Sequence, residues 1–152
     1  GIPLWIAGGG ERKTLRIAAR HADYTNFDGS PEGFAHKSEV LFGHCADVGR
    51  DPSEITRTAN YNVAVGETEK EVADRLAFLR DRMARHVGAD EADRQLGAYR
   101  GLPAVGTPEQ IVDKLRELEG LGMTYGVFYF PEIATDTSGL ELFEREVIPA
   151  LA

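Results

Sequence analysis

The stretch Leu4-Trp5-Ile6-Ala7-Gly8-Gly9-Gly10-Glu11-Arg12-Lys13-Thr14 decides the fold that this sequence predicts. Its first four residues are a continuous apolar run, as in strands of a parallel sheet whose two faces are both covered. Three glycines then interrupt the pattern, and from Leu15 to Ala22 apolar residues recur at helical spacing. The stretch therefore predicts a buried strand that passes through a glycine turn directly into a helix.

The rest of the chain repeats the strand–helix order three more times. Apolar and β-branched content predicts strands at residues 23–27, 55–65 and 126–130. Helical periodicity predicts helices at 31–48, 69–87, 108–121 and from 138 to the end, with one short helix in the polar segment 88–103. Helix starts are marked by Ser30 before Pro31 and by capping boxes that begin at Thr68, Thr107 and Ser138.

This alternation predicts an α/β fold with parallel strands and right-handed crossovers. Two closures of the sheet fit the order. One is an open doubly wound sheet, and the other is half of an eight-stranded barrel, which needs about 250 residues when complete. The chain of 152 residues begins in the middle of an apolar run. Since chain termini are normally exposed and loose, we expect an earlier part of the same domain outside this sequence.

The composition disfavours several classes of protein. Lys and Arg total 17 against 25 Asp and Glu, a net charge of −8, which disfavours binding to nucleic acid or to an anionic membrane. No apolar run reaches the ~20 residues of a membrane span. The single cysteine, Cys45, lies on the apolar face of a predicted helix and is expected to be a buried structural thiol. We therefore expect a cytoplasmic protein with no nucleic-acid or membrane partner.

The glycines Gly8, Gly9 and Gly10 are the strongest candidate for a binding site. Glycine lets the backbone approach a ligand closely, and the start of the following helix offers unpaired N–H groups and partial positive charge. This combination predicts an anion site, most often for phosphate, to which Arg12 and Lys13 add charge. The P-loop and dinucleotide fingerprints fail, because Arg12 precedes Lys13 and Lys13 stands where a third glycine belongs. The alternative is a tight turn that serves only helix packing.

The carboxyl ends of the strands are where parallel strand–helix folds place their ligands. This rule nominates Asn26 as a hydrogen-bonding side chain, Tyr129 as part of an aromatic wall and Glu132 as the best placed carboxylate. We assign these three residues to a substrate pocket. The four histidines form no HxxxH or HExxH pair, so no metal site is expected. No catalytic residue is identified.

Several segments, in their order and spacing, match a known family. The segments are Pro3–Arg16 with Ala18–Asp23, Val65–Glu69, Val105–Ile111, and Gly120–Met123 with Val127–Phe130. They resemble the bacterial-luciferase-like monooxygenase family, and most closely its branch that uses the deazaflavin coenzyme F420. The resemblance implies a (β/α)8 barrel, of which this chain supplies strands five to eight, the C-terminal half. It also implies that Ala7, Gly8, Gly9 and Gly10 bind coenzyme F420 or, alternatively, FMN. We assign Arg12 to the same cofactor site because of its charge.

The implied activity is hydride transfer between a bound flavin or deazaflavin and a small organic substrate. Proton-handling residues of this family come from strands one to four, so the chain alone is expected to be inactive. Family members that act on a sugar phosphate place a lysine after the sixth strand, whereas Asp28-Gly29-Ser30 stands there in this chain. That difference counts against a sugar-phosphate substrate.

A half barrel has open strand edges, and this determines the expected partners. We expect the chain to pair with a second copy or with the missing N-terminal half. Two alternatives stay open at this point: a non-catalytic doubly wound module that binds a nucleotide, and a structural subunit.

Overall fold

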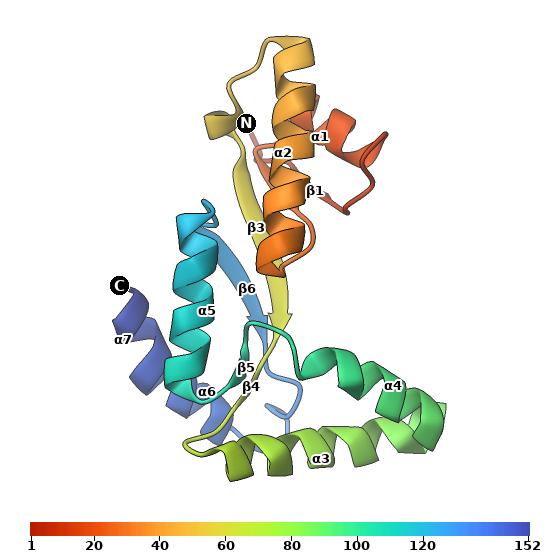
Figure 1. The fold of residues 1–152 in the computed structure, drawn as a ribbon, viewed down its shortest axis with the longest axis vertical. Coiled ribbons are helices and arrows are strands. Elements are labelled where there is room, and N and C mark those ends of the chain that lie inside the picture. The colour runs from red at the N-terminus through yellow and green to blue at the C-terminus, as the bar shows by residue number, and fades with distance from the viewer. The chain divides into compact units, whose positions relative to one another are not determined.

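The computed structural model describes residues 1–152 and divides them into two compact units. Unit 1 comprises residues 1–60 and 117–127, and unit 2 comprises residues 61–116 and 128–152. Figure 1 shows the elements of both units coloured along the chain. None of the helices is both long and apolar enough to cross a lipid bilayer.

The main sheet has four strands in the order β1-β2-β3-β6. They are β1 (Trp5–Ala7), β2 (Tyr24–Asn26), β3 (Thr56–Asn62), which follows a single 3₁₀ turn η1 (Pro52–Glu54), and β6 (Tyr125–Tyr129). Strands β1, β2 and β3 pair in parallel, with Tyr24 opposite both Trp5 and Thr56. A doubly wound sheet reverses its strand order at a switch point, whereas this order never reverses. The doubly wound closure is therefore excluded, and the order agrees with part of a barrel.

Helix α2 (Pro31–Val48) begins and ends where the sequence predicts. The Ser30 hydroxyl accepts a hydrogen bond from the Gly33 amide at 3.1 Å, and Pro31 takes the first helical position, where its missing N–H costs nothing. Gly49, with φ 69°, ends the helix in the left-handed region that glycine adopts without strain.

Helix α1 (Thr14–His21) begins later than predicted. Residues 11–13 form a turn after the glycines, and the Leu15 amide donates to the Gly10 carbonyl at 3.0 Å. No side chain caps the first amides of α1. The predicted start directly after Gly10 is therefore wrong by three residues.

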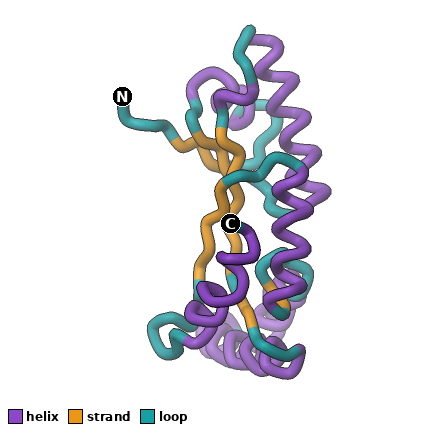
Figure 2. Tube along the Cα trace, turned by 90° about the vertical axis from the view of Figure 1, so that its left-hand side faces the viewer, coloured by secondary structure: helices purple, strands orange, loops and turns teal.

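The helices of unit 1 cover one face of its strands. Leu15 of α1 and Phe34 of α2 are fully buried, as is Cys45, and burial raises the pKa of the Cys45 thiol. The expectation of a buried structural thiol is thereby confirmed. In contrast, Trp5 is 45% exposed and its ring stacks on that of Tyr24 at 4.5 Å. The apolar run predicted that β1 is covered on both faces, whereas within this chain one of its side chains, Trp5, is exposed. Figure 2 shows the strands in orange and the helices in purple.

Arg57 on β3 links three elements of unit 1. Its guanidinium donates to Ser38 Oγ at 2.8 Å and to the Leu121 carbonyl at 3.0 Å. It also lies over the rings of Phe34 and Phe42, 5.4 and 5.0 Å from their centroids. Burial lowers the pKa of Arg57 from its ordinary value, but a guanidinium remains charged at neutral pH. Arg57 therefore holds α2 and the turn before β6 against β3.

Replacing Arg57 with methionine is expected to lower the free energy of unfolding by about 2 kcal/mol, because a charged donor to two acceptors is lost. Urea unfolding followed by circular dichroism measures the change. Arg16→Met is the matched control, since Arg16 is exposed on α1 and its side chain forms no hydrogen bond. A loss at Arg57 no larger than the control loss would show that the link is not stabilising.

Unit 2 is built around a parallel pair of short strands. These are β4 (Ala64–Val65) and β5 (Val105–Gly106). The helices of this part of the chain are α3 (Glu69–Val87), α4 (Ala89–Tyr99) and α5 (Pro108–Gly120), which extends beyond unit 2 at its end. Helices α3 and α4 form a hairpin at the bottom of Figure 1. The core contains the buried side chains of Ala64, Val72, Leu76, Leu79, Leu96 and Val105.

Two of the three predicted capping boxes are present. Thr68 Oγ1 accepts from the Glu71 amide at 3.2 Å at the start of α3. At the start of α5, the Thr107 amide donates to Gln110 Oε1 at 3.0 Å, and Thr107 Oγ1 accepts from the Gln110 amide. Both helices therefore begin where the sequence predicts.

The prediction of a single strand at 55–65 is wrong at the C-terminal end of that range. It breaks at Val63, whose amide donates to the Tyr129 carbonyl at 2.8 Å. Beyond this break Ala64 and Val65 pair with Val105 and Gly106 instead. The break separates β3 from β4, and the residues on either side join different sheets.

The C-terminal helix also departs from its prediction. It consists of α6 (Ser138–Leu142), a π-helical stretch η2 (Phe143–Val147) and α7 (Ile148–Leu151). The capping box predicted at Ser138 is wrong, because the Ser138 hydroxyl accepts a hydrogen bond from Arg75 instead of from a helix amide. Pro149 has no N–H and its ring would crowd the preceding turn of an α-helix, which accounts for the wider turns before it.

Candidate functional site

The glycine segment of unit 1 connects the end of β1 to the turn before α1. The Gly8 amide donates to the Asn26 carbonyl at 2.7 Å and so continues the β1–β2 ladder by one residue. Gly8 has φ 120°, a conformation that L side chains rarely adopt, and a Cβ at Gly10 would lie 2.8 Å from the Thr14 hydroxyl. Gly8 is therefore favoured by its backbone conformation, and a side chain at Gly10 would have to displace the Thr14 side chain. The Gly8 amide is used within the chain and is not available to a ligand.

The next two amides are free. The N–H groups of Gly9 and Gly10 donate to no acceptor of the chain. The side chain of Lys37 from α2 passes beside Gly9, since a Cβ built there would stand 3.4 Å from Lys37 Cε and 4.0 Å from its Nζ. Bare amides beside an ammonium group are an environment suited to an oxygen anion. Sequence reasoning missed Lys37, because no local pattern marks it and both α1 and β2 lie between it and the glycines in the sequence.

Glu11 gathers basic side chains of α2 next to this segment. Its Oε1 accepts from Lys37 Nζ at 2.6 Å and lies 3.0 Å from His36 Nε2, and its carbonyl accepts from His44 Nε2 at 2.7 Å. The hydrogen bond from Lys37, followed by that from His36, lowers the pKa of the Glu11 carboxyl. Glu11 is therefore ionised at neutral pH, and a phosphate on the free amides would share Lys37 with it.

The other predicted residues of unit 1 flank the glycines. Ala7 is exposed and pairs with Asn26 in register. Asn26 Nδ2 donates to Thr58 Oγ1 at 3.0 Å and to Asn60 Oδ1 at 2.8 Å, which leaves Asn26 Oδ1 as an unused acceptor. Arg12 is exposed and forms no ion pair. The structure thus brings Asn26 to the glycine segment, and the assignment of Arg12 to the cofactor site stays a prediction.

Tyr129 and Glu132 belong to unit 2. Tyr129 is 53% exposed, whereas Glu132 is 4% exposed and forms an ion pair with Arg75 of α3. Arg75 also lies 3.4 Å from Asp136 and donates to Ser138 Oγ at 2.7 Å. Glu132 therefore anchors the loop after β6 to α3. Its assignment to a substrate pocket, like that of Tyr129, stays a prediction.

Replacing Arg75 with methionine is expected to lower the free energy of unfolding by about 3–5 kcal/mol, because it leaves the Glu132 carboxylate buried without its partner. Glu132→Gln in the same chain should restore part of the loss, since the amide carries no charge. Urea unfolding of the two single variants and the double variant measures this coupling. Arg82→Met, at an exposed arginine of α3 that forms no ion pair, is the control. Equal losses at Arg75 and Arg82 would contradict the anchoring role.

The sequence profile of luciferase-like monooxygenases matches residues 1–125, a range that includes the glycine segment and Lys37. This chain belongs to the luciferase-like monooxygenase family. The curated phthiodiolone/phenolphthiodiolone dimycocerosates ketoreductase of Mycobacterium sp. (strain JLS) is 35% identical to it over 75 residues. That match covers 48% of this chain and 20% of the ketoreductase.

Solved structures of similar proteins confirm the fold. The coenzyme F420-dependent tetrahydromethanopterin reductase of Methanopyrus kandleri superposes with a TM-score of 0.72 at 20% identity, over 99% of this chain and 51% of the reductase. Riboflavin lyase, solved with modified FMN and riboflavin, superposes with a TM-score of 0.74 at 18% identity, over 97% of this chain and 42% of the lyase. The luciferase-like chain thus spans about half the length of these proteins, and its parallel α/β fold corresponds to part of a TIM barrel.

Proposed function

We propose that the Gly8–Gly10 segment binds the phosphate of coenzyme F420 in an oxidoreductase that transfers a hydride between this coenzyme and a small organic substrate. FMN is the second candidate. The observation that carries the proposal is the pair of free amides at Gly9 and Gly10, with the Lys37 side chain beside Gly9. The similarity to an F420-dependent reductase and to a protein solved with modified FMN supports both candidates.

The residues of the segment fit a phosphate group. Each free amide can donate one hydrogen bond, and Lys37 can add a charge-assisted one. Gly9 leaves open the space that a Cβ would fill against Lys37. The bound ring supplies the hydride chemistry, while this chain binds and orients the coenzyme. Asn26 Oδ1 offers an acceptor beside the same segment.

FMN should bind this chain at least tenfold more tightly than riboflavin, because riboflavin lacks the phosphate that the amides and Lys37 would hold, and one charge-assisted hydrogen bond accounts for about a tenfold change. Fluorescence titration at equal pH and salt measures both dissociation constants, and coenzyme F420 is titrated in the same way. Equal affinities for FMN and riboflavin would contradict a phosphate site. Absence of binding by all three would favour the structural-subunit alternative.

Gly9→Val should weaken binding of the phosphorylated coenzyme about tenfold or more, because the side chain crowds the free amides and Lys37. Gly9 does not have a positive φ, and its Cβ makes only ordinary van der Waals contact, so the variant should fold. Gly43→Val is the matched control, because a Cβ at Gly43 on α2 meets nothing within 4 Å. If both variants bind like the unaltered chain, the glycines serve only the turn.

We also propose that β1, an edge of the main sheet, pairs with another chain segment. Leu4 and Trp5 are 53% and 45% exposed there, and an exposed strand edge can pair with a further strand. The partner would be a second copy or the N-terminal half of the barrel. Sedimentation equilibrium should show self-association that Leu4→Lys weakens. A folded monomer at every concentration, with or without the N-terminal half, would contradict the pairing.

A further inference from the structure

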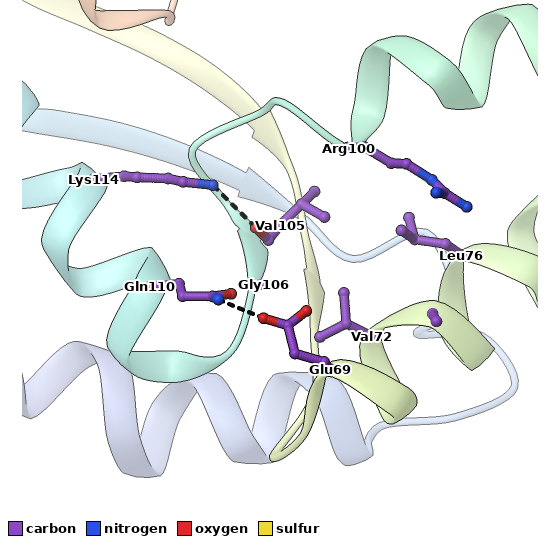
Figure 3. Close-up of a pocket in the computed structure, with 9 residues that line it drawn as sticks. Glu69, Val72, Leu76, Arg100, Val105, Gly106, Gln110 and Lys114 are labelled. Carbon is purple, nitrogen blue, oxygen red and sulfur yellow. Dashed lines mark hydrogen bonds between the residues drawn. The ribbon is translucent and has the colours of Figure 1, made fainter.

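Unit 2 contains a pocket that is separate from the glycine segment. It lies between α3, β5, α5 and the residue that follows α4, and it has a volume of about 420 Å³ (Figure 3). Its apolar lining comes from Val72 and Leu76 of α3 and from Val105 of β5. A volume of this size is in the range of pockets that hold small organic ligands.

Two cationic side chains line the same pocket. Lys114 of α5 is half-buried, and its ammonium group donates only to the carbonyls of Leu102 and Val105, at 3.5 and 3.4 Å. The side chain of Arg100, which follows α4, forms no hydrogen bond and no ion pair. Both side chains therefore keep donors free for a ligand.

Lys114 differs from the other half-buried cations of the chain. Lys37, Arg50, Arg75 and Arg80 each pair with a carboxylate. Arg57 has no carboxylate but has two short hydrogen bonds and two aromatic rings. Lys114 has only two long contacts to carbonyls, although half-buried charges are normally paired.

The one carboxylate of the pocket does not neutralise this lysine. Glu69 accepts a hydrogen bond from Gln110 Nε2, and Figure 3 shows that bond apart from the one between Lys114 and Val105. Two cations and one carboxylate give the lining a net charge of +1 in a chain whose net charge is −8. A single negative charge on a ligand would balance the lining.

We propose that this pocket binds a small aliphatic monocarboxylate. The carboxylate accepts a hydrogen bond from Lys114, Arg100 adds positive charge to the lining, and the alkyl chain lies on Val72, Leu76 and Val105. The apolar lining favours an alkyl chain over inorganic phosphate, and the net charge of +1 favours a monoanion over a neutral alcohol. The site is independent of the coenzyme site proposed above, because it uses none of the same residues.

Titration of the chain with octanoate, followed by amide chemical shifts in NMR spectra, tests the site. We expect saturable shifts at Val72, Leu76, Val105 and Lys114, with octanol and inorganic phosphate each binding at least tenfold more weakly. Octanol binding as tightly as octanoate would overturn the role of the cations, and phosphate binding as tightly would overturn the role of the apolar lining. Shifts that do not saturate would overturn the site itself.

Variants distinguish a role of the two cations in binding from a role in folding. Lys114→Met and Arg100→Gln should each weaken octanoate binding about tenfold. The Arg100 side chain is exposed and forms no bond, so Arg100→Gln should fold normally even if Lys114→Met does not. Lys70→Met is the control, because Lys70 lies on α3, pairs with Asp74 and does not line the pocket. Octanoate affinity unchanged by Arg100→Gln, or lowered equally by Lys70→Met, would overturn the proposal.

Discussion

The hydrogen bond from the Gly8 amide to the Asn26 carbonyl determines where the candidate site lies. It extends the parallel β1–β2 ladder one residue beyond β1, and it does so in a backbone conformation that suits glycine. Beyond this bond the chain leaves the sheet, and the amides of Gly9 and Gly10 have no acceptor. An internal bond at one glycine is thus directly followed by two unused donors.

The second requirement is the position of α2. Its N-terminus is fixed by Ser30 and Pro31, and its middle is held by Arg57 through Ser38. The same helix carries Lys37, whose side chain reaches the glycines and whose ammonium group bonds Glu11. The positive charge beside the free amides therefore depends on the packing of a helix that is distant from them in sequence.

Local signals in the sequence predicted most of the fold. Proline and serine at 30–31, the glycine at 49 and the capping boxes at Thr68 and Thr107 act within one helical turn, and the helices that they mark begin as predicted. Failures occurred where a distant residue competes with the local pattern. Ser138 bonds Arg75 instead of capping its helix, and Ala64 and Val65 pair with β5 instead of continuing β3.

The candidate site also has features that the sequence could predict and features that it could not. The glycines and the strand-end residue Asn26 could be found from the sequence, because strand ends and glycine turns are local patterns. The internal use of the Gly8 amide and the approach of Lys37 could not, since both depend on contacts between separate elements. For Glu132 the sequence indicated a carboxylate at a strand end, but its partner Arg75 lies on a helix far along the chain.

The amide resonances of the three glycines test the central claim most directly. In NMR spectra recorded during titration with FMN, the Gly9 and Gly10 amides should shift saturably as they begin to donate to the phosphate. The Gly8 amide, already bonded to Asn26, should shift much less. Shifts that are largest at Gly8, or that are absent from all three glycines while FMN binds elsewhere, would contradict the account.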